Sequence, residues 1–210
     1  ASVAGSRAWE PKNYDGKDEG AMRMRTALAK SKNMVSIRLL QSSGVSFIQD
    51  YATRFGFDAD KHPAYLTMAL GAGSVTPWQM VSAYSVFANG GYRIQPYIVR
   101  DIRDANGNIL AGSQPVVAGD KSLLVIDPRN AYLMDSMLRD VTIYGTAGRA
   151  SATLKRRDLA GKTGTTNEHV DAWFCGYQRT VVGCSWIGFD QPKNLGNGET
   201  GGSAALPAWI

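Results

Sequence analysis

The spacing of apolar residues differs between the two parts of this chain. Over its last third the pattern has a period of two, most clearly after Asp171, where Trp173, Cys175 and Tyr177 fall on one face and Phe174 and Gly176 on the other. A period of two is typical of a β-strand. We therefore predict an antiparallel meander of three strands, at about 161–166, 170–177 and 181–189.

The first two thirds follow helical spacing instead. Thr76-Pro77 begins the clearest helix, because threonine is a good N-cap and proline fits the first helical position. Asn89-Gly90-Gly91 ends it. Another helix begins near Ala21 and is interrupted at Ser31-Lys32-Asn33. Further helices are predicted at 44–55, at 128–144 and just after 146.

Between these helices, Tyr97 to Arg103 alternates like a strand, turns at Asn106-Gly107 and returns through Ile109 and Leu110 as a hairpin. Helices followed by antiparallel strands make an α+β fold. The chain therefore divides into a mainly helical part at 1–160, with a hairpin near 97–110, sheet strands at 161–190 and a tail at 191–210.

Composition narrows the classes of function. The 210 residues suit one domain, and 44% of them are hydrophobic. The 23 Lys and Arg exceed the 18 Asp and Glu by five, which mildly favours anionic partners. No basic run occurs, so we expect no nucleic-acid partner. No apolar stretch approaches the roughly 20 residues of a membrane span.

The chain has two cysteines and two histidines. Cys175 and Cys184 flank a turn and can face each other across a hairpin, although we favour two buried, unpaired thiols. His62 and His169 have no partner at metal-ligand spacing and are expected to be ordinary surface residues. We expect no metal and no cofactor.

Gly161-Lys162-Thr163-Gly164-Thr165-Thr166 sets a cation and three hydroxyls between glycines. Glycine weakens a strand unless something approaches its backbone closely, so this segment is expected to face a ligand. A phosphate-binding loop is disfavoured, because Arg156 stands where that motif requires glycine. Glu168, just beyond, is expected to be a solvated loop carboxylate.

Ser31 and Asn33 lie at the helix break, where such residues usually serve only as caps. Lys162-Thr163-Gly164 follows 131 residues later (162 minus 31). Together these segments resemble the second and third signature motifs of the penicillin-recognising serine acyltransferases. Further blocks, in the family's order, resemble the transpeptidase domain of class A bifunctional penicillin-binding proteins, most closely the 1a type: Trp9–Gly16, Thr76–Met80, Ala88–Gly91, Asp171–Tyr177 and Trp186–Asp190.

The family's first motif, Ser-x-x-Lys, is missing. It holds the nucleophile and its activating lysine, yet no serine here has lysine three positions later. The resemblance therefore implies the carboxy-terminal portion of a transpeptidase domain, with an incomplete penicillin-binding-protein/β-lactamase-like fold. Its expected partners are peptidoglycan stem peptides, β-lactam antibiotics and the remainder of the same polypeptide, which holds the nucleophile helix, the glycosyltransferase domain and the membrane anchor. The expected location is the periplasmic face of the bacterial inner membrane.

The resemblance also implies roles for individual residues. Ser31 relays a proton to the leaving amine, Asn33 binds the acyl-donor amide, and Lys162 keeps the site positive. The substrate-binding residues are Thr163, Gly164, Thr165 and Thr166. Among these, the hydroxyls of Thr163 and Thr165 bind the substrate carboxylate, and the Thr165 N–H forms half of an oxyanion hole.

Two other functions stay open at this stage. One is a serine β-lactamase or D,D-carboxypeptidase, with water as acceptor. The other is a catalytically silent binding module that kept the cleft. We also expect the 210 residues expressed alone to be insoluble or molten, because the apolar stripes of 44–55 and 76–89 lack the family's central helix.

Overall fold

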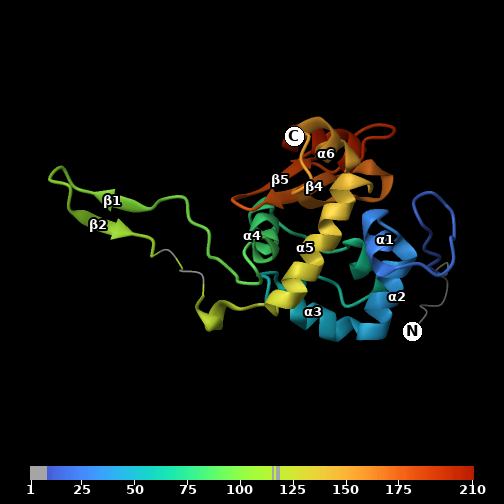
Figure 1. Cartoon of the computed structure of the whole chain (residues 1–210), viewed down its shortest axis with the longest axis horizontal. Helices are drawn as coiled ribbons and strands as arrows, with labels where there is room; N and C mark the ends of the chain where they lie inside the picture. Colours follow the sequence, from blue (N-terminus) through green and yellow to red (C-terminus); the bar gives the residue numbers. More distant parts are fainter. Residues whose placement is uncertain (1–8, 115, 117–118) are drawn as a thin grey trace.

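The computed structural model describes residues 9–114, 116 and 119–210. Figure 1 shows a body of helices and sheet from which one thin arm projects. Three helices come first: α1 (Met24–Ala29), α2 (Asn33–Ser43) and α3 (Val45–Thr53). The predicted break at Ser31 is confirmed. Among the described residues, none of the helices combines the length and the apolar character that a membrane crossing requires.

The helices predicted at 76–89, at 128–144 and just after 146 are also confirmed. In α4 (Pro77–Ala88), the Thr76 hydroxyl accepts a hydrogen bond from the Gln79 N–H, and the Gln79 side-chain Oε1 accepts one from the Thr76 N–H. The other two are α5 (Pro128–Ile143) and α6 (Gly148–Leu154). Short 3-10 turns connect the elements: η1 (Ala59–Lys61), η2 (Leu66–Leu70), η3 (Lys121–Leu123) and η4 (Asn167–His169).

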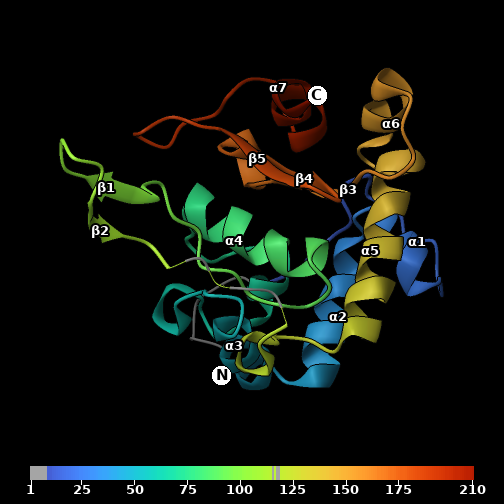
Figure 2. The same cartoon turned by 60° about the vertical axis from the view of Figure 1, so that its left-hand side comes forward.

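The meander is confirmed as the antiparallel sheet β3-β4-β5, formed by β3 (Ala160–Thr165), β4 (Ala172–Gln178) and β5 (Val181–Ile187). Figure 2 shows α4 below this sheet and α7 above it. Within the described chain, β3 pairs on one side only, so it is an edge strand. This leaves the backbone groups of its other side available.

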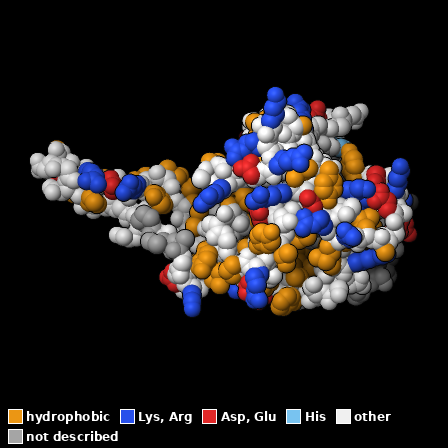
Figure 3. Space-filling view, in the orientation of Figure 1, with side chains coloured by type: hydrophobic (Ala, Val, Ile, Leu, Met, Phe, Trp, Pro, Cys, Tyr) orange, Lys and Arg blue, Asp and Glu red, His pale blue; other side chains and the backbone are white. Residues whose placement is uncertain are grey.

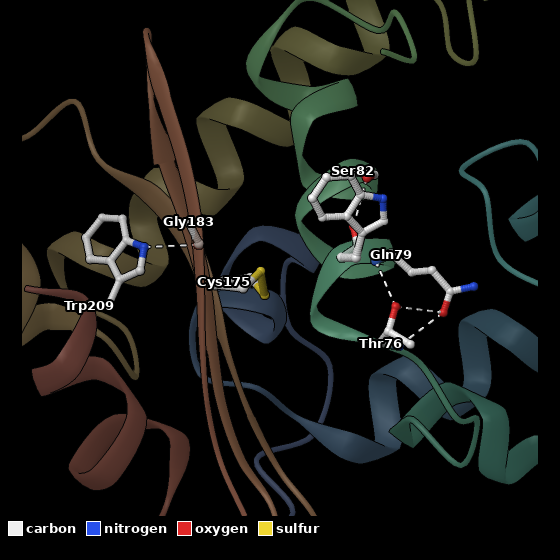
Figure 4. Close-up of a disulfide and its surroundings, with 8 residues drawn as sticks. Thr76, Gln79, Ser82, Cys175, Gly183 and Trp209 are labelled. Atoms are coloured by element: carbon white, nitrogen blue, oxygen red, sulfur yellow. Dashed lines mark hydrogen bonds between the residues drawn. A yellow bond between two sulfur atoms is a disulfide. The ribbon is translucent and has the colours of Figure 1, made fainter. Parts of the chain in front are cut away.

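The expectation of unpaired cysteines is wrong. The strand register places Cys175 directly opposite Cys184, and the two form a disulfide with a Cα–Cα distance of 4.1 Å. Such a short distance brings side chains on one face of two strands together. Figure 4 shows the disulfide on the α4 side of the sheet, with Trp209 on the opposite side.

The arm is the hairpin of β1 (Asp101–Arg103) and β2 (Ile109–Gly112). It leaves the body as an isolated two-stranded sheet (Figures 1 and 2). The first strand is shorter than predicted, because residues 97–100 are not part of a strand and the chain bends at Ile98. Apolar side chains remain exposed along it, including Ile98, Ile109 and Leu110.

The end of the chain is more than a tail. It forms a π-helical turn, η5 (Gly201–Ala205), and a final helix, α7 (Leu206–Trp209). Leu206 is completely buried in the largest core cluster, and Trp209 donates a hydrogen bond to the Gly183 carbonyl at 3.0 Å. The cluster joins α5, α6 and the sheet through Val141, Ala147, Ala150, Leu159, Ala172, Phe174, Ala205 and Leu206.

The visible surface has no single-sign charge patch. Figure 3 shows lysine and arginine side chains scattered among acidic and apolar ones on the face that it presents. The basic excess is therefore spread out over this face.

Candidate active site

Strand β3 borders a cavity of about 950 Å³. Lys162 to Thr166 form one wall, and residues from α2, α3, η2 and the start of α4 form the facing walls. Most of the facing walls are apolar, with side chains that include Leu39, Leu40, Ile48, Ala52, Met68, Ala69, Leu70, Met80 and Tyr84. Lys162 and the polar residues that follow it in β3 therefore face a cavity whose other walls are mostly apolar.

Lys162 and Ser31 meet at this wall. The Lys162 Nζ donates to the Ser31 Oγ at 2.7 Å and to the Thr163 carbonyl at 2.9 Å. Burial lowers the pKa of Lys162 to about 8, because desolvation penalises the ammonium form. A lysine that can exchange protons near neutral pH is therefore in hydrogen-bond contact with a serine hydroxyl.

Ser31 has a backbone conformation that usually belongs to glycine. Its φ is 54°, in the left-handed region. Its N–H bonds to the Leu28 carbonyl, and the Lys32 N–H bonds to the Ala27 carbonyl. These two bonds form a Schellman motif, in which glycine is the common residue at the position of Ser31. Serine at this position has a strained backbone, and its side chain places a hydroxyl at the end of α1.

The structure does not bring the Asn33 amide into the cavity. Asn33 is the first residue of α2, and its Nδ2 donates to the Lys12 carbonyl at 2.9 Å. Of the predicted catalytic residues, Ser31 and Lys162 are therefore in contact, whereas the side chain of Asn33 binds the amino-terminal loop.

Each predicted substrate-binding hydroxyl already has a protein partner. Thr163 Oγ1 lies 2.6 Å from Thr146 Oγ1, Thr165 Oγ1 accepts from the Gly201 N–H at 3.0 Å, and Thr166 Oγ1 accepts from the Asp171 N–H at 2.7 Å. A hydroxyl has one donor and two acceptor positions, so each keeps capacity for a ligand. These contacts orient the hydroxyls.

The two glycines of β3, Gly161 and Gly164, differ in how closely their neighbours pack against them. A Cβ on Gly164 would come no closer than 3.3 Å to Trp173 Cβ. A Cβ on Gly161 would lie 2.7 Å from both the Cys175 carbonyl oxygen and the Phe174 ring. Gly161 is therefore required by packing against β4, and the expectation that a ligand explains it was wrong.

Three further residues line the cavity, although the sequence analysis predicted no site role for them. Trp173 and Trp186 lie side by side with ring centroids 6.1 Å apart, and the Trp186 Nε1 donates to Asp171 Oδ1 at 2.9 Å. All three line the cavity. The available signal was the register: Trp173 alternates in step with Cys175, which pairs with Lys162.

Three residues expected at the surface, the two histidines and Glu168, have different surroundings in the structure. His62 was expected at the surface, but it lines the cavity and contacts the Phe57 ring edge-on at 5.4 Å. His169 is half-buried, with Nδ1 2.9 Å from the Glu199 carbonyl oxygen. Glu168 is exposed in the β3–β4 connection, as expected.

Comparisons with known proteins agree with this geometry. The family described as "Penicillin binding protein transpeptidase domain" matches residues 2–203. Penicillin-binding protein 1A of Neisseria flavescens is 50% identical over 99% of this chain, and that of Neisseria gonorrhoeae is 51% identical over 96%. The crystal structure of penicillin-binding protein 1A from Haemophilus influenzae superposes with a TM-score of 0.90 at 35% identity over the whole chain.

The chain spans only part of these proteins: 26% of the N. flavescens protein, 25% of the N. gonorrhoeae protein and 36% of the H. influenzae structure. Both the sequence matches and the structural match nevertheless cover almost all of the 210 residues. By its sequence, its fold and the contact between Ser31 and Lys162, the chain belongs to the transpeptidase domain family of the penicillin-binding proteins, of the 1A type.

Proposed function

We propose that this chain is the carboxy-terminal part of a peptidoglycan D,D-transpeptidase. The reaction is acyl transfer: a serine attacks the carbonyl between two D-alanines of a stem peptide, the terminal D-alanine leaves, and an amine of a neighbouring stem resolves the acyl-enzyme. β-Lactams acylate the same serine. The observation that carries this proposal is the 2.7 Å contact between Lys162 Nζ and Ser31 Oγ at the edge of the cavity.

This contact suits protonation of the leaving group. The departing amine must gain a proton as the C–N bond breaks, and a positioned acid supplies it. In our proposal Ser31 gives its hydroxyl proton to that amine and regains one from Lys162. A lysine pKa of about 8 lets this exchange occur without a large energy gap near neutral pH.

The rest of β3 binds the substrate. Its unpaired edge can accept an extended peptide as an added strand, and the Thr165 N–H can stabilise the oxyanion. Lys162 attracts the terminal carboxylate, while Thr163 and Thr165 donate to it. Thr166 lies at the end of the same strand and completes the binding wall. We assign Asn33 to the acyl-donor amide, a role that requires its side chain to leave the Lys12 carbonyl.

The nucleophile comes from outside the 210 residues in this proposal. The 950 Å³ cavity lies directly beside Lys162, and its apolar walls suit a helix that carries Ser-x-x-Lys at its centre. The remainder of the same polypeptide is therefore the first partner of this chain, together with its glycosyltransferase domain and membrane anchor.

The proposed location is the periplasmic face of the bacterial inner membrane. The Cys175–Cys184 disulfide supports it, because disulfides persist in oxidising compartments and are rare in the cytosol. The reaction as proposed uses no metal, cofactor or nucleic acid.

Fluorescent-penicillin labelling of the native preparation, read on a denaturing gel, tests the proposal. Label on a band heavier than the 22.7 kDa of this chain would support a nucleophile on the longer polypeptide. Label at 22.7 kDa would place the nucleophile within these residues and contradict that part of the proposal. No label would favour the silent binding module. A second assay separates transpeptidase from carboxypeptidase. A transpeptidase joins an added D-amino acid to the stem peptide, whereas a carboxypeptidase passes the acyl group to water only.

A further inference from the structure

We infer that residues 12–19, here named the latch loop, position Ser31 for catalysis. Contacts from this loop surround the turn between α1 and α2 and fix the hydroxyl toward Lys162. The inference rests on the proposed function and adds positioning residues outside the three signature motifs.

The first contact is an ion pair between a buried ammonium and two partly exposed carboxylates. Lys32, which directly follows Ser31, is only 4% exposed. Its Nζ lies 2.6 Å from Asp15 Oδ2 and 3.5 Å from Glu19 Oε1. A buried ammonium is costly unless it is paired, so these two carboxylates hold the Lys32 side chain inward. The backbone of the turn is thereby fixed at the residue next to Ser31.

The second contact caps α2. Lys32 occupies the N-cap position and provides no side-chain cap. Asn13 substitutes for it from the latch loop, because its Oδ1 accepts from the Met34 N–H at 3.2 Å. Asn13 is itself fixed by donating from Nδ2 to the Lys17 carbonyl at 2.7 Å. A free N–H in the first helical turn is thus satisfied by a residue 21 positions away.

A further contact extends the clamp. The Tyr14 ring meets His169 edge-on, with centroids 6.3 Å apart. His169 belongs to the connection between β3 and β4, so the latch loop touches both the serine side and the lysine side of the site.

Such a clamp is needed because Ser31 is strained. A non-glycine residue in the left-handed region costs on the order of 1 kcal/mol, and it persists only where its surroundings enforce it. Relaxation of Ser31 to a common conformation would swing the hydroxyl away from Lys162. Because general-acid catalysis depends on position, the loss would fall on the acylation step more than on penicillin capture.

The test measures acylation of the full-length protein by penicillin over a range of concentrations. Lys32→Met removes the paired charge but keeps an apolar stem that tolerates burial. We expect the acylation rate at saturating penicillin to fall by about tenfold or more, while the half-saturating concentration changes by less than about twofold. Lys32→Arg should restore most of the rate.

Lys121→Met is the control. Lys121 is exposed in η3, and no hydrogen bond or ion pair of the described residues joins its side chain to the latch loop. We expect wild-type acylation from this variant. Equal rates for Lys32→Met and Lys121→Met would overturn the inference while leaving the proposed function intact, whereas an unlabelled wild-type protein would overturn both.

A second variant decides the matter if Lys32→Met fails to fold. Asp15→Asn removes the charge from the exposed end of the 2.6 Å pair and leaves the loop length and polarity unchanged. Slower acylation with an unchanged melting temperature would support the inference. Unchanged acylation would overturn it.

Discussion

The two sides of the site are held by different forces. On the sheet side, Lys162 projects from a strand whose neighbours Phe174 and Leu206 are completely buried, so apolar packing fixes it. On the turn side, Ser31 lies between two short helices in a strained backbone conformation, and an ion pair and a helix cap hold it there. The packed core therefore sets the position of the cation, whereas polar contacts set the direction of the hydroxyl.

The largest effect should come from Lys162→Ala, which removes the functional group from the rigid side. Acylation of the full-length protein by penicillin should fall about a hundredfold, comparable to the loss of one oxyanion-stabilising donor in other enzymes. Stopped-flow or gel-based labelling measures this. Lys121→Ala, an exposed lysine in η3, is the control and should keep the wild-type rate. Unchanged acylation of Lys162→Ala would contradict the role given to this lysine.

Gly201→Ala should test how rigid the sheet side is. A Cβ at this position would lie 2.3 Å from the Trp173 carbonyl oxygen and 2.5 Å from that of Gly164. These backbone atoms belong to paired strands and cannot move away easily, so we expect a destabilisation of roughly 2–3 kcal/mol. Thermal or denaturant unfolding of the full-length protein measures it. Gly148→Ala, whose Cβ would come no closer than 3.5 Å to its neighbours, should be nearly neutral.

The disulfide contributes to the same rigid side. Replacing Cys175 and Cys184 together by alanine should lower the melting temperature, with a cost of about 2 kcal/mol, because the pair closes a short loop. Peptide mapping of the unreduced protein by mass spectrometry should find the peptide of Cys175 joined to that of Cys184. Separate peptides with free thiols at both positions would contradict the pairing.

Lys162→Arg should change the capture of a carboxylate little near neutral pH and most clearly above it, whereas the return of a proton to Ser31, which uses the lysine pKa of about 8, should be lost at every pH. Lysine with a pKa of about 8 is charged below that pH and loses its charge as the pH rises through it. Capture of a carboxylate by the wild-type protein should therefore weaken by about tenfold between pH 7 and pH 9. Arginine stays charged throughout this range, so the variant should keep a flat profile. The pH dependence of penicillin acylation measures both, and parallel profiles would rule out Lys162 as the titrating group.

Local patterns predicted most elements because their causes are local. Thr76-Pro77 marked a helix start through capping chemistry, and the alternation from Trp173 to Tyr177 marked a strand. The same reasoning left residues 201–209 as an unassigned tail. Their glycines and alanines carry no clear period, and the burial of Leu206 against Phe174 becomes visible only in three dimensions.

The candidate site was predictable in part. The resemblance joined Ser31 to Lys162 across 131 residues, and the 2.7 Å contact agrees with it. It did not predict the direction of the Asn33 side chain or the buried state of Lys32. Both depend on the latch loop, whose polar residues are typical of any surface loop when read one at a time.

The sequence by itself determined the helices, the meander, the family and the chemical groups of the site, because capping, periodicity and motif order are properties of neighbouring residues. Only the tertiary structure decided the rest. It paired Cys175 with Cys184, assigned Gly161 to packing, and enclosed Lys32 between two carboxylates. These outcomes depend on strand register and on contacts between distant segments, and no local pattern along the chain specifies such distances.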